Sequence, residues 1–406
     1  MGKDTLTTGD NEGCWRMGKR IGILTQYYKS SNYGGNLQAY ALCKALNALG
    51  YTAEQIKYDH YATTNGQQVR PSGSRLKKLL NPKLVWQYAL YSTRHMFRRL
   101  VLGKSLDQRN TAVSKFNQGE IPHGDCAYTP QSIRECTEYD AYIVGSDQVW
   151  NPDWYQMAYF LDFVPQRKKK FSYAASIGKK ELTPEQREVF REKLADFAAV
   201  SVREQDAVEL LENLSPVPVV QTLDPTLLLT REQWDEVCSE RLIPGKYIFT
   251  YFLGADENQR KVAAAFAGKK KLPIVTLPFL EGSFRKCDVF FGDKKLYDIS
   301  PADFISLIKH AEYVLTDSFH ACVFSSIYQK EFFAFHRLGH AGMGGRLYSL
   351  TKLFHSEDHF CDTKERANLG YIQSCEPIDY NKPHAEFDQM RMQSAEFLIR
   401  NLSDTV

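Results

Sequence analysis

Short apolar segments alternate with segments of helical periodicity along most of this chain, and no other feature limits its fold as strongly. The first unit starts with the apolar run at residues 20–25, RIGILT, which a polar loop with two glycines follows. Residues 36–49 then place alanine and leucine at helical spacing, and Gly50 is typical of a helix end. Residues 51–58 read as a second strand. This order predicts a βαβ unit of a doubly wound parallel sheet.

The same alternation continues farther along the chain. Further predicted strands lie at residues 140–144, 171–176, 198–202, 217–220, 247–253, 273–277, 313–316 and 331–335. Because 406 residues exceed one ordinary core, we predict an α/β protein with two Rossmann-like domains, at 20–235 and 243–380, that face each other across a cleft. Residues 385–402 are expected to form a helix that packs back across the domains. Residues 1–19 are polar and are predicted to form a flexible tail.

Residues 61–120 interrupt this rhythm and carry a strong charge bias. Between Arg70 and Lys115 there are 11 Lys or Arg residues, and Asp107 is the single acid. Helical periodicity is visible around residues 84–101. We expect a helical insertion in the first domain with a solvated basic face. The alternative is a surface that attracts anionic lipid headgroups or a polyanionic substrate.

Composition and charge exclude several classes of protein. The chain has 51 Lys and Arg against 48 Asp and Glu, and this balance argues against a dedicated nucleic-acid binder. No apolar run reaches the roughly 18 residues of a membrane-spanning helix. The 9 cysteines include no C-x-x-C pair, and the first residues lack the apolar segment of a signal peptide. We therefore expect a cytoplasmic protein with reduced thiols and, because no His/Cys cluster has ligand spacing, no bound metal.

Ligands of doubly wound sheets bind at the turns that follow the carboxyl ends of the strands. The turn at 31–36, SNYGGN, brings two glycines to a helix N-terminus, where a ligand can approach the backbone closely. Without a G-x-G-x-x-G pattern it does not indicate a dinucleotide site, and the alternative is a plain loop. The turn at 144–152, VGSDQVWNP, combines amide, carboxylate and indole groups, which suits carbohydrate. The alternative there is a capped turn with Trp150 in the core.

Two further turns carry residues that bind anions or transfer protons. Arg203 follows a predicted strand and precedes a helix, which favours phosphate or carboxylate binding. The alternative is a salt bridge with Glu204 or Asp206. His320 lies in the turn at 316–321, TDSFHA, where an imidazole at the cleft can act as an acid or a base. The alternative is a structural histidine.

Taken together, these motifs resemble the polysaccharide pyruvyl transferase family. The matching segments occur in family order over about residues 20–350, and they are IGILT, NYGGNLQAYALCKALNALGY, YIVGSDQVWNP, FSYAASIG, SVREQDA, LDPTLLL and DFISLIKHAEYVLTDSFHACVFSSIYQKEFF. The resemblance implies a fold similar to the two-domain GT-B glycosyltransferases. It also implies transfer of a pyruvyl group from phosphoenolpyruvate to two sugar hydroxyls, which forms a ketal in a bacterial polysaccharide or cell-wall glycan.

The resemblance assigns roles to particular residues. The family's arginine and histidine fall on Arg203 and His320, which are expected to be catalytic. The candidates for a further basic residue are His336, Arg337, His340 and Arg346. Arg346 is preferred, since Gly-Gly-Arg before a helix resembles a loop arginine of many members. Residues expected to contact the donor are Arg203, Ser318, Phe319, His320, Arg337 and Arg346. Residues expected to contact the acceptor are Asn32, Tyr33, Gly34, Asp147, Gln148, Trp150 and Asn151.

The expected partners follow from the same resemblance. Phosphoenolpyruvate is the donor substrate and no cofactor is expected. The acceptor is a sugar or a lipid-linked oligosaccharide, and the basic segment would then contact the anionic inner face of the membrane peripherally. No nucleic-acid partner is expected, and the oligomeric state is left open. Two alternatives remain at this stage: a GT-B enzyme that uses a nucleotide sugar, and a catalytically silent carbohydrate-binding protein.

Overall fold

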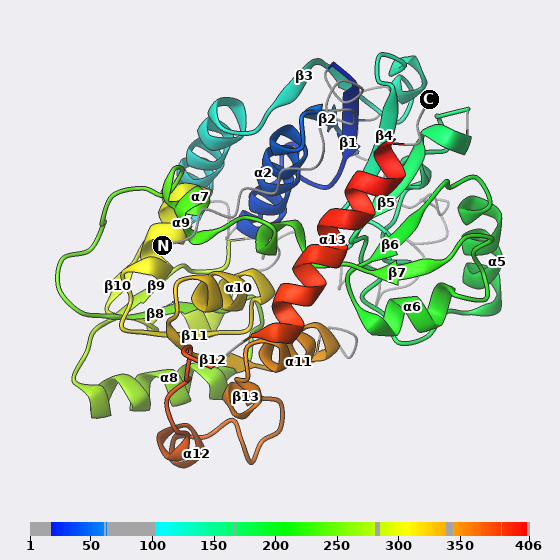
Figure 1. Cartoon of the computed structure of the whole chain (residues 1–406). Helices are drawn as coiled ribbons and strands as arrows, with labels where there is room; N and C mark the ends of the chain where they lie inside the picture. Colours follow the sequence, from blue (N-terminus) through cyan, green and yellow to red (C-terminus); the bar gives the residue numbers. More distant parts are fainter. Residues whose placement is uncertain are drawn as a thin grey trace, which may run out of the picture.

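Two parallel sheets with helices packed around them make up the chain (Figure 1). The computed structural model describes residues 18–60, 62, 102–165, 167–280, 285–337, 344–382 and 384–403. The strands of the first sheet are β1 (Arg20–Leu24), β2 (Thr52–Tyr58), β3 (His123–Tyr128), β4 (Ala141–Gly145) and β5 (Lys170–Tyr173), in the order β3-β2-β1-β4-β5. The pair β6 (Val200–Val202) and β7 (Val219–Gln221) extends it, since Phe171 and Ala175 of the β5 region bridge Ala199 and Val202.

The second sheet repeats the strand order of the first. Its strands are β8 (Ile248–Tyr251), β9 (Ile274–Thr276), β10 (Lys294–Lys295), β11 (Tyr313–Thr316), β12 (Glu331–Phe335) and β13 (Phe360–Cys361), in the order β10-β9-β8-β11-β12-β13. The named strand pairs of both sheets are parallel. In each sheet the first strand of the domain is central and the order in which strands are added reverses beside it, as in Rossmann folds. The predicted fold class is therefore confirmed.

Helices connect these strands. They are α2 (Tyr33–Ala48), a helix at 102–119, α5 (Pro184–Leu194), α6 (Gln205–Leu211), α7 (Arg231–Asp235), α8 (Glu257–Lys270), α9 (Pro301–Lys309), α10 (Phe319–Ile327), α11 (Gly344–Leu353), α12 (Leu369–Ser374) and α13 (Ala385–Ser403). The 3₁₀ turns are Ile133–Glu135, Met157–Phe160, Arg167–Lys169, Pro225–Leu227, Lys286–Asp288 and Glu357–His359. The first helix begins earlier than predicted, at Tyr33, because Asn32 Oδ1 accepts a hydrogen bond from Gly35 N and caps it.

One apolar cluster joins the two domains through α2. Tyr33 of α2 stacks on Phe304 of α9, with ring centres 5.0 Å apart. The same cluster contains Trp234 of α7 and Phe324 of α10, whose rings meet edge to face at 4.8 Å. Because large aromatic side chains from both domains are buried in it, the hydrophobic effect holds the two domains together at this face.

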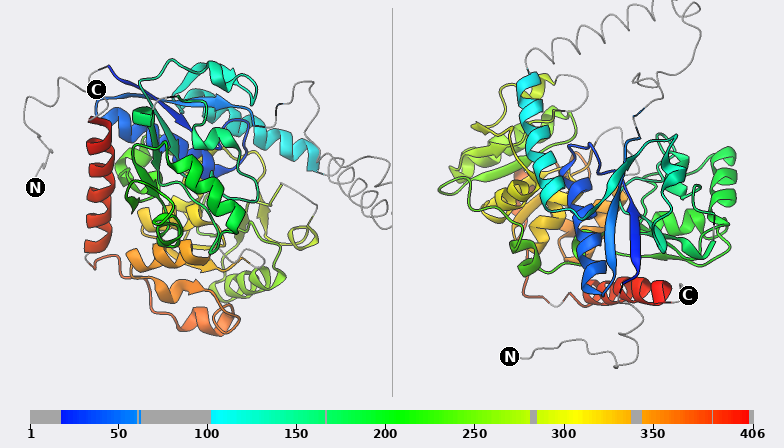
Figure 2. Two further views of the ribbon diagram at one scale, coloured as in Figure 1. Left: turned by 90° about the vertical axis from the view of Figure 1, so that its right-hand side faces the viewer. Right: turned by 90° about the horizontal axis from the view of Figure 1, so that it is seen from above.

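The C-terminal helix α13 runs from the second domain to the first (Figures 1 and 2). Near its start, Phe387 packs on Phe354, which follows α11. Toward its end, Leu398 and Leu402 are buried against apolar residues of β1, β4 and β5. Between them, Ser394 Oγ accepts a hydrogen bond from Leu223 N at 2.9 Å. The helix therefore contributes buried surface to both domains.

Several predictions fall in parts of the chain that the structure does not describe. The predicted tail lies outside the described residues up to residue 17, and the predicted insertion does so at residues 61 and 63–101. From residue 102 the chain forms the helix at 102–119, which leads into β3. Within the described ranges, none of the helices combines the length and the apolar character that crossing a membrane requires.

We predict that Leu398→Ala destabilises the protein, because it removes a buried side chain between α13 and the first sheet. The free energy of unfolding should fall by about 2–5 kcal/mol. Glu396→Ala is the matched control, since Glu396 is exposed on the same helix, and it should change stability by less than about 0.5 kcal/mol. Urea unfolding measures both variants. Equal effects would show that α13 is not packed as described.

Candidate functional site

The candidate site lies where strands of both domains end. Arg203 follows β6, Asp224 follows β7, and His320 is in the first turn of α10, which follows β11. The N-terminus of α2, which follows β1, adds Gly34. The carboxyl ends of parallel strands meet at one edge of a sheet, so these turns come together although they are far apart in the sequence. Residues from both domains thus form one site.

The Asp224 carboxylate is the centre of this site. Its Oδ2 accepts hydrogen bonds from Arg203 Nη1 at 2.7 Å and from Ser146 Oγ at 3.0 Å. The same oxygen lies 3.6 Å from Nε2 of His320, which belongs to the other domain. Its Oδ1 accepts from the backbone N and the hydroxyl of Thr226, at 3.0 and 2.6 Å. One buried carboxylate therefore contacts the predicted arginine and the predicted histidine together.

The charge of Asp224 depends on these neighbours. Burial alone would raise the pKa of the carboxyl, because an anion loses its hydration in the interior. The contacts with His320, Arg203 and Thr226 outweigh burial and hold the pKa of Asp224 well below its usual range. Asp224 is therefore ionised at neutral pH, and its carboxylate orients the side chains of Arg203 and His320 beside it.

Gly34 of α2 and His320 of α10 are in close contact. A Cβ atom at Gly34 would lie 2.0 Å from Nδ1 of the His320 ring and 2.5 Å from its Cγ. No side chain fits in that space, so only glycine lets the imidazole rest on the helix N-terminus. The His320 ring is thus held between Gly34 on one domain and Asp224 at the end of β7.

Two buried arginines lie over the ring of Phe319. The Cζ atoms of Arg203 and Arg346 are 4.9 and 5.8 Å from the ring centre. Arg346 is 6% exposed, and its Nε has no hydrogen-bond partner. Burial, and next the positive charge of Arg203, lower the pKa of Arg346 to about 10. Because the charge of Arg203 destabilises that of Arg346, an anion bound between the two guanidiniums would stabilise both.

Further polar atoms at the site lack hydrogen-bond partners in the described structure. They are Nε and Nη2 of Arg203, Nε of Arg346, Nε2 of His320 and Oε2 of Glu204, which lies 3.8 Å from Nε of Arg203. Buried polar groups in native proteins are almost always paired, and unpaired ones mark places where a ligand supplies the partner. Four of these five atoms are nitrogens of basic side chains, and an anion with several acceptor oxygens would suit them.

The other residues predicted to contact the donor have structural partners. Ser318 caps α10, with its Oγ accepting from Ala321 N at 3.5 Å. Arg337 Nη2 donates to the carbonyl oxygen of Asp317 at 3.0 Å, and its Nε is 3.5 Å from the Asp317 carboxylate. Ser318 therefore positions the helix that carries His320, and Arg337 braces the turn before it. His340, a weaker candidate, lies outside the described residues.

The residues predicted to contact the acceptor separate into two groups. Asn32 is exposed at the N-terminus of α2, and Asp147 Oδ1 lies 3.8 Å from Arg203 Nη2. Asp147 has φ of 59°, a left-handed conformation that turns the chain sharply after β4. Gln148 is buried beside Gly178, and its Oε1 accepts a weak hydrogen bond from Asn151 Nδ2 at 3.5 Å. Asn32 and Asp147 thus lie at the site, whereas the two amides stabilise the turn.

The prediction that Trp150 and Tyr33 contact a sugar is wrong. Trp150 is 0% exposed, stacks on Phe160 and donates from Nε1 to the carbonyl oxygen of Tyr159. Tyr33 is also 0% exposed and packs on Phe304. Neither ring presents a face to a ligand, because each fills an apolar core. For Trp150, the alternative of a capped turn with a core tryptophan is the one that the structure supports.

Asp224 and Ser146 are the site residues that sequence reasoning missed. Both stand after a strand, in the motifs LDPTLLL and VGSDQVWNP, so the strand-end rule that selected Arg203 applied to them too. Asp224 also precedes a proline and caps the turn Pro225–Leu227, which gives it an ordinary structural explanation. Its contact with His320 depends on the packing of the second domain and has no local signal. Among the described residues, no three His, Cys, Asp or Glu side chains gather as a metal site would require.

We predict that Asp224→Asn removes an acid-sensitive part of the stability. The folded-state pKa of Asp224 is depressed, so its ionised form stabilises the protein above the ordinary Asp pKa of about 3.9, and this stabilisation is lost as the pH falls through that range. At pH 7 the variant should lose about 3 kcal/mol of unfolding free energy. The difference from wild type should shrink between about pH 5 and pH 2.

Urea unfolding across this pH range measures that difference. Asp153→Asn is the control, because Asp153 is half-exposed and forms a surface pair with Lys179, and it should have almost no effect at any pH. If the unfolding free energy of Asp224→Asn stayed below that of wild type by the same amount at every pH, the depressed pKa of Asp224 would be contradicted.

Several solved structures are similar to this chain. UDP-GlcNAc 2-epimerase from Methanocaldococcus jannaschii is 12% identical, with a TM-score of 0.53 over 95% of this chain and 99% of that chain. UDP-GlcNAc 2-epimerase from Neisseria meningitidis bound to UDP-GlcNAc is 12% identical, with a TM-score of 0.45 over 95% and 99%. Arabidopsis thaliana UGT89C1 is 10% identical, with a TM-score of 0.46 over 95% and 98%. At these identities the likeness concerns the fold, and the first structure confirms the predicted GT-B-like arrangement.

The family is given by the sequence itself. No curated protein matches the chain. A sequence model of the polysaccharide pyruvyl transferase family matches residues 32–337, which is most of the chain and includes Arg203, Asp224 and His320. Arg346 lies beyond the matched segment. The match agrees with the motifs found in the sequence, and the chain therefore belongs to the polysaccharide pyruvyl transferase family.

Proposed function

We propose that this protein transfers a pyruvyl group from phosphoenolpyruvate to two hydroxyls of a sugar and releases inorganic phosphate. The observation that carries the proposal is the pair of buried arginines, Arg203 and Arg346, over Phe319, with the unpaired Nε2 of His320 close by. Phosphoenolpyruvate bears a phosphate and a carboxylate, and two guanidinium planes suit two such groups. Membership of a pyruvyl transferase family supports the same donor.

The proposed chemistry needs one proton donor and a fixed positive surface. Protonation of the donor methylene makes a methyl group and leaves the central carbon electrophilic. A sugar hydroxyl adds to that carbon and loses its proton. The carbon–oxygen bond to phosphate then breaks, phosphate departs, and a second hydroxyl closes the ketal. The sum is one sugar diol plus phosphoenolpyruvate giving one pyruvyl ketal plus phosphate, with no oxidant or metal in the balance.

The geometry suits His320 for the proton transfers and the arginines for the charge. Protonated His320 would donate to the methylene or to the departing phosphate, with Asp224 beside its Nε2 stabilising the imidazolium. Arg203 and Arg346 would stabilise the negative charge that develops on the leaving phosphate. The positive end of α10, capped by Ser318, adds to that field. Asp147 and the N-terminus of α2 border the site on the first domain, where the acceptor would bind.

A phosphate-release assay tests this proposal. The protein is incubated with phosphoenolpyruvate and a panel of galactosides, mannosides and N-acetylated sugars, and in parallel with UDP-sugars. We expect release from phosphoenolpyruvate only, and His320→Ala should reduce it by about 100-fold or more while the protein stays folded. Turnover of a UDP-sugar would indicate a nucleotide-sugar enzyme. Sugar binding without release from either donor would indicate a catalytically silent protein.

A second prediction concerns the contact between Gly34 and His320. Gly34→Ala places a methyl group where the imidazole lies, so the ring must move and kcat should fall by about 100-fold. Gly35→Ala is the matched control on the same helical turn, since its Cβ would lie 3.3 Å from Gln26 O and 3.6 Å from Asp147 Oδ2. That variant should keep most of its activity. Steady-state kinetics compares them, and equal losses would mean that the position of His320 does not limit turnover.

A further inference from the structure

Arg109 is a buried arginine that the site described above does not use. It belongs to the helix at 102–119, where it shares a buried face with Val113 and Phe116. Arg109 is 3% exposed, and within the described parts of the chain neither its Nε nor its Nη2 has a hydrogen-bond partner. Removing a guanidinium from water without such partners is unfavourable. A ligand from outside the chain would supply the acceptors that Nε and Nη2 lack.

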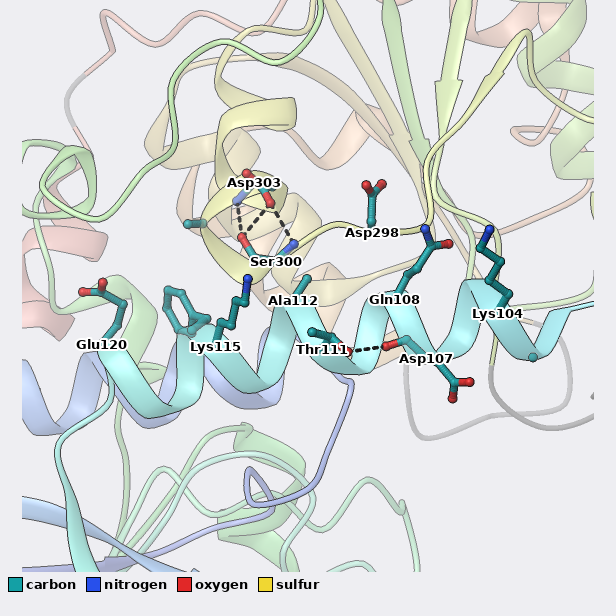
Figure 3. A pocket seen from close by; sticks show the side chains of 13 residues that line it. Lys104, Asp107, Gln108, Thr111, Ala112, Lys115, Glu120, Asp298, Ser300 and Asp303 are labelled. Carbon is teal, nitrogen blue, oxygen red and sulfur yellow. Dashed lines mark hydrogen bonds between the residues drawn. The ribbon is translucent and has the colours of Figure 1, made fainter.

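The other basic residues described on this helix behave differently. Lys104 and Lys115 are exposed and line a cavity of about 1020 Å³ between the helix and the start of α9 (Figure 3). The acids of the same lining are Asp107, Glu120, Asp298 and Asp303. The expected solvated basic face is therefore found at Lys104 and Lys115, which lie among both acidic and basic side chains. Arg109 does not belong to that face, because its side chain is buried in the protein.

Arg109 lies close to the N-terminus of α2. Its Cζ is 5.4 Å from the ring centre of Tyr33, the first residue of that helix, and the next residue is Gly34, which contacts His320. The helix has 16 residues and no acid of its own in its first turn, although the Asp147 carboxylate approaches that turn at Gly35. Tyr297 of the second domain is also near, because Arg109 counteracts the rise that burial causes in the pKa of Tyr297. Arg109 therefore lies between the two domains.

We propose that Arg109 and the N-terminus of α2 bind an oxyanion of the acceptor, a phosphate or a carboxylate carried by the sugar. The inference rests on the proposed function, since it takes Arg203 and Arg346 as the partners of the donor's two anionic groups. Arg109 approaches from the α2 side, where the acceptor is expected. A planar guanidinium suits either anion, because both present two oxygens to its fork of N–H donors. The acceptor class is therefore an anionic glycan.

Binding measurements on the full chain test this assignment without any turnover. Isothermal titration compares galactose 1-phosphate, galacturonate, neutral galactose and phosphoenolpyruvate on wild type, Arg109→Met and Lys115→Met. Wild type should bind one of the two anionic sugars at least tenfold more tightly than galactose, and the preferred one identifies phosphate or carboxylate as the anion. Arg109→Met should lose that preference and keep its affinity for phosphoenolpyruvate within twofold. Lys115→Met removes the same charge from the exposed side of the helix and should change each affinity by less than twofold.

Three results would overturn the assignment. The first is a wild type that binds both anionic sugars no more tightly than galactose. The second is an Arg109→Met variant that loses affinity for phosphoenolpyruvate, which would place Arg109 at the donor. The third is a Lys115→Met variant that loses the preference for the anionic sugar as Arg109→Met does. That result would mean that any positive charge on the helix at 102–119 has the same effect. None of these results depends on whether phosphoenolpyruvate is turned over. The phosphate-release assay tests the proposed function, and the binding measurements test the role of Arg109.

Thermal unfolding in anion-free buffer separates this role from a structural one. Arg109→Met keeps an apolar side chain over Tyr33 and removes a buried unpaired charge, so its melting temperature should equal or exceed that of wild type. A melting temperature that drops sharply would show that Arg109 supports the fold and would count against the proposal. Arg109→Lys keeps the charge without the planar fork and should retain part of the preference for the anionic sugar.

Discussion

A single buried carboxylate, that of Asp224, organises the site of this protein. An ionised carboxylate away from water persists only where cations and hydrogen-bond donors surround it. Arg203, Ser146 and Thr226 provide them from the first half of the chain, and His320 approaches the same oxygen from the second domain. The negative charge thus fixes the arginine and the imidazole relative to each other, although they follow strands of different sheets.

Packing between the domains brings His320 to the Asp224 carboxylate. The Tyr33 ring is buried against α9, and the neighbouring Gly34 leaves space for His320 where any side chain would collide with it. The C-terminal helix α13 adds buried surface on both domains. Apolar contacts thus supply the energy that holds the domains together, whereas the glycine and the carboxylate set the geometry of the few polar groups between them.

Sequence reasoning located the strand ends, and with them Arg203 and His320, because both stand in turns whose flanking periodicity is local. It misplaced Trp150 and Tyr33, since an aromatic ring in a turn is equally compatible with a sugar face and with a core. It overlooked Asp224, whose aspartate–proline turn looks like an ordinary cap. It treated the basic segment as uniform, although Arg109 is buried and Lys115 is exposed on one helix. For Tyr33 and Asp224 the deciding neighbours, Phe304 and His320, are distant in sequence.

The sequence by itself determined the parallel α/β fold class, most of the strands and the family, because hydrophobic periodicity and turn motifs act over a few residues. It did not indicate β3, β10 or β13. Only the tertiary structure decided which of the chemically similar side chains are buried, paired or left without a partner. Burial and pairing depend on segments that are far apart in the sequence, as the contact of Asp224 Oδ2 with Nε2 of His320 and that of Gly34 with the His320 ring show. The tertiary structure also brings Arg203 and Arg346 to the ring of Phe319, and nothing near Arg203 in the sequence indicates that Arg346 lies there.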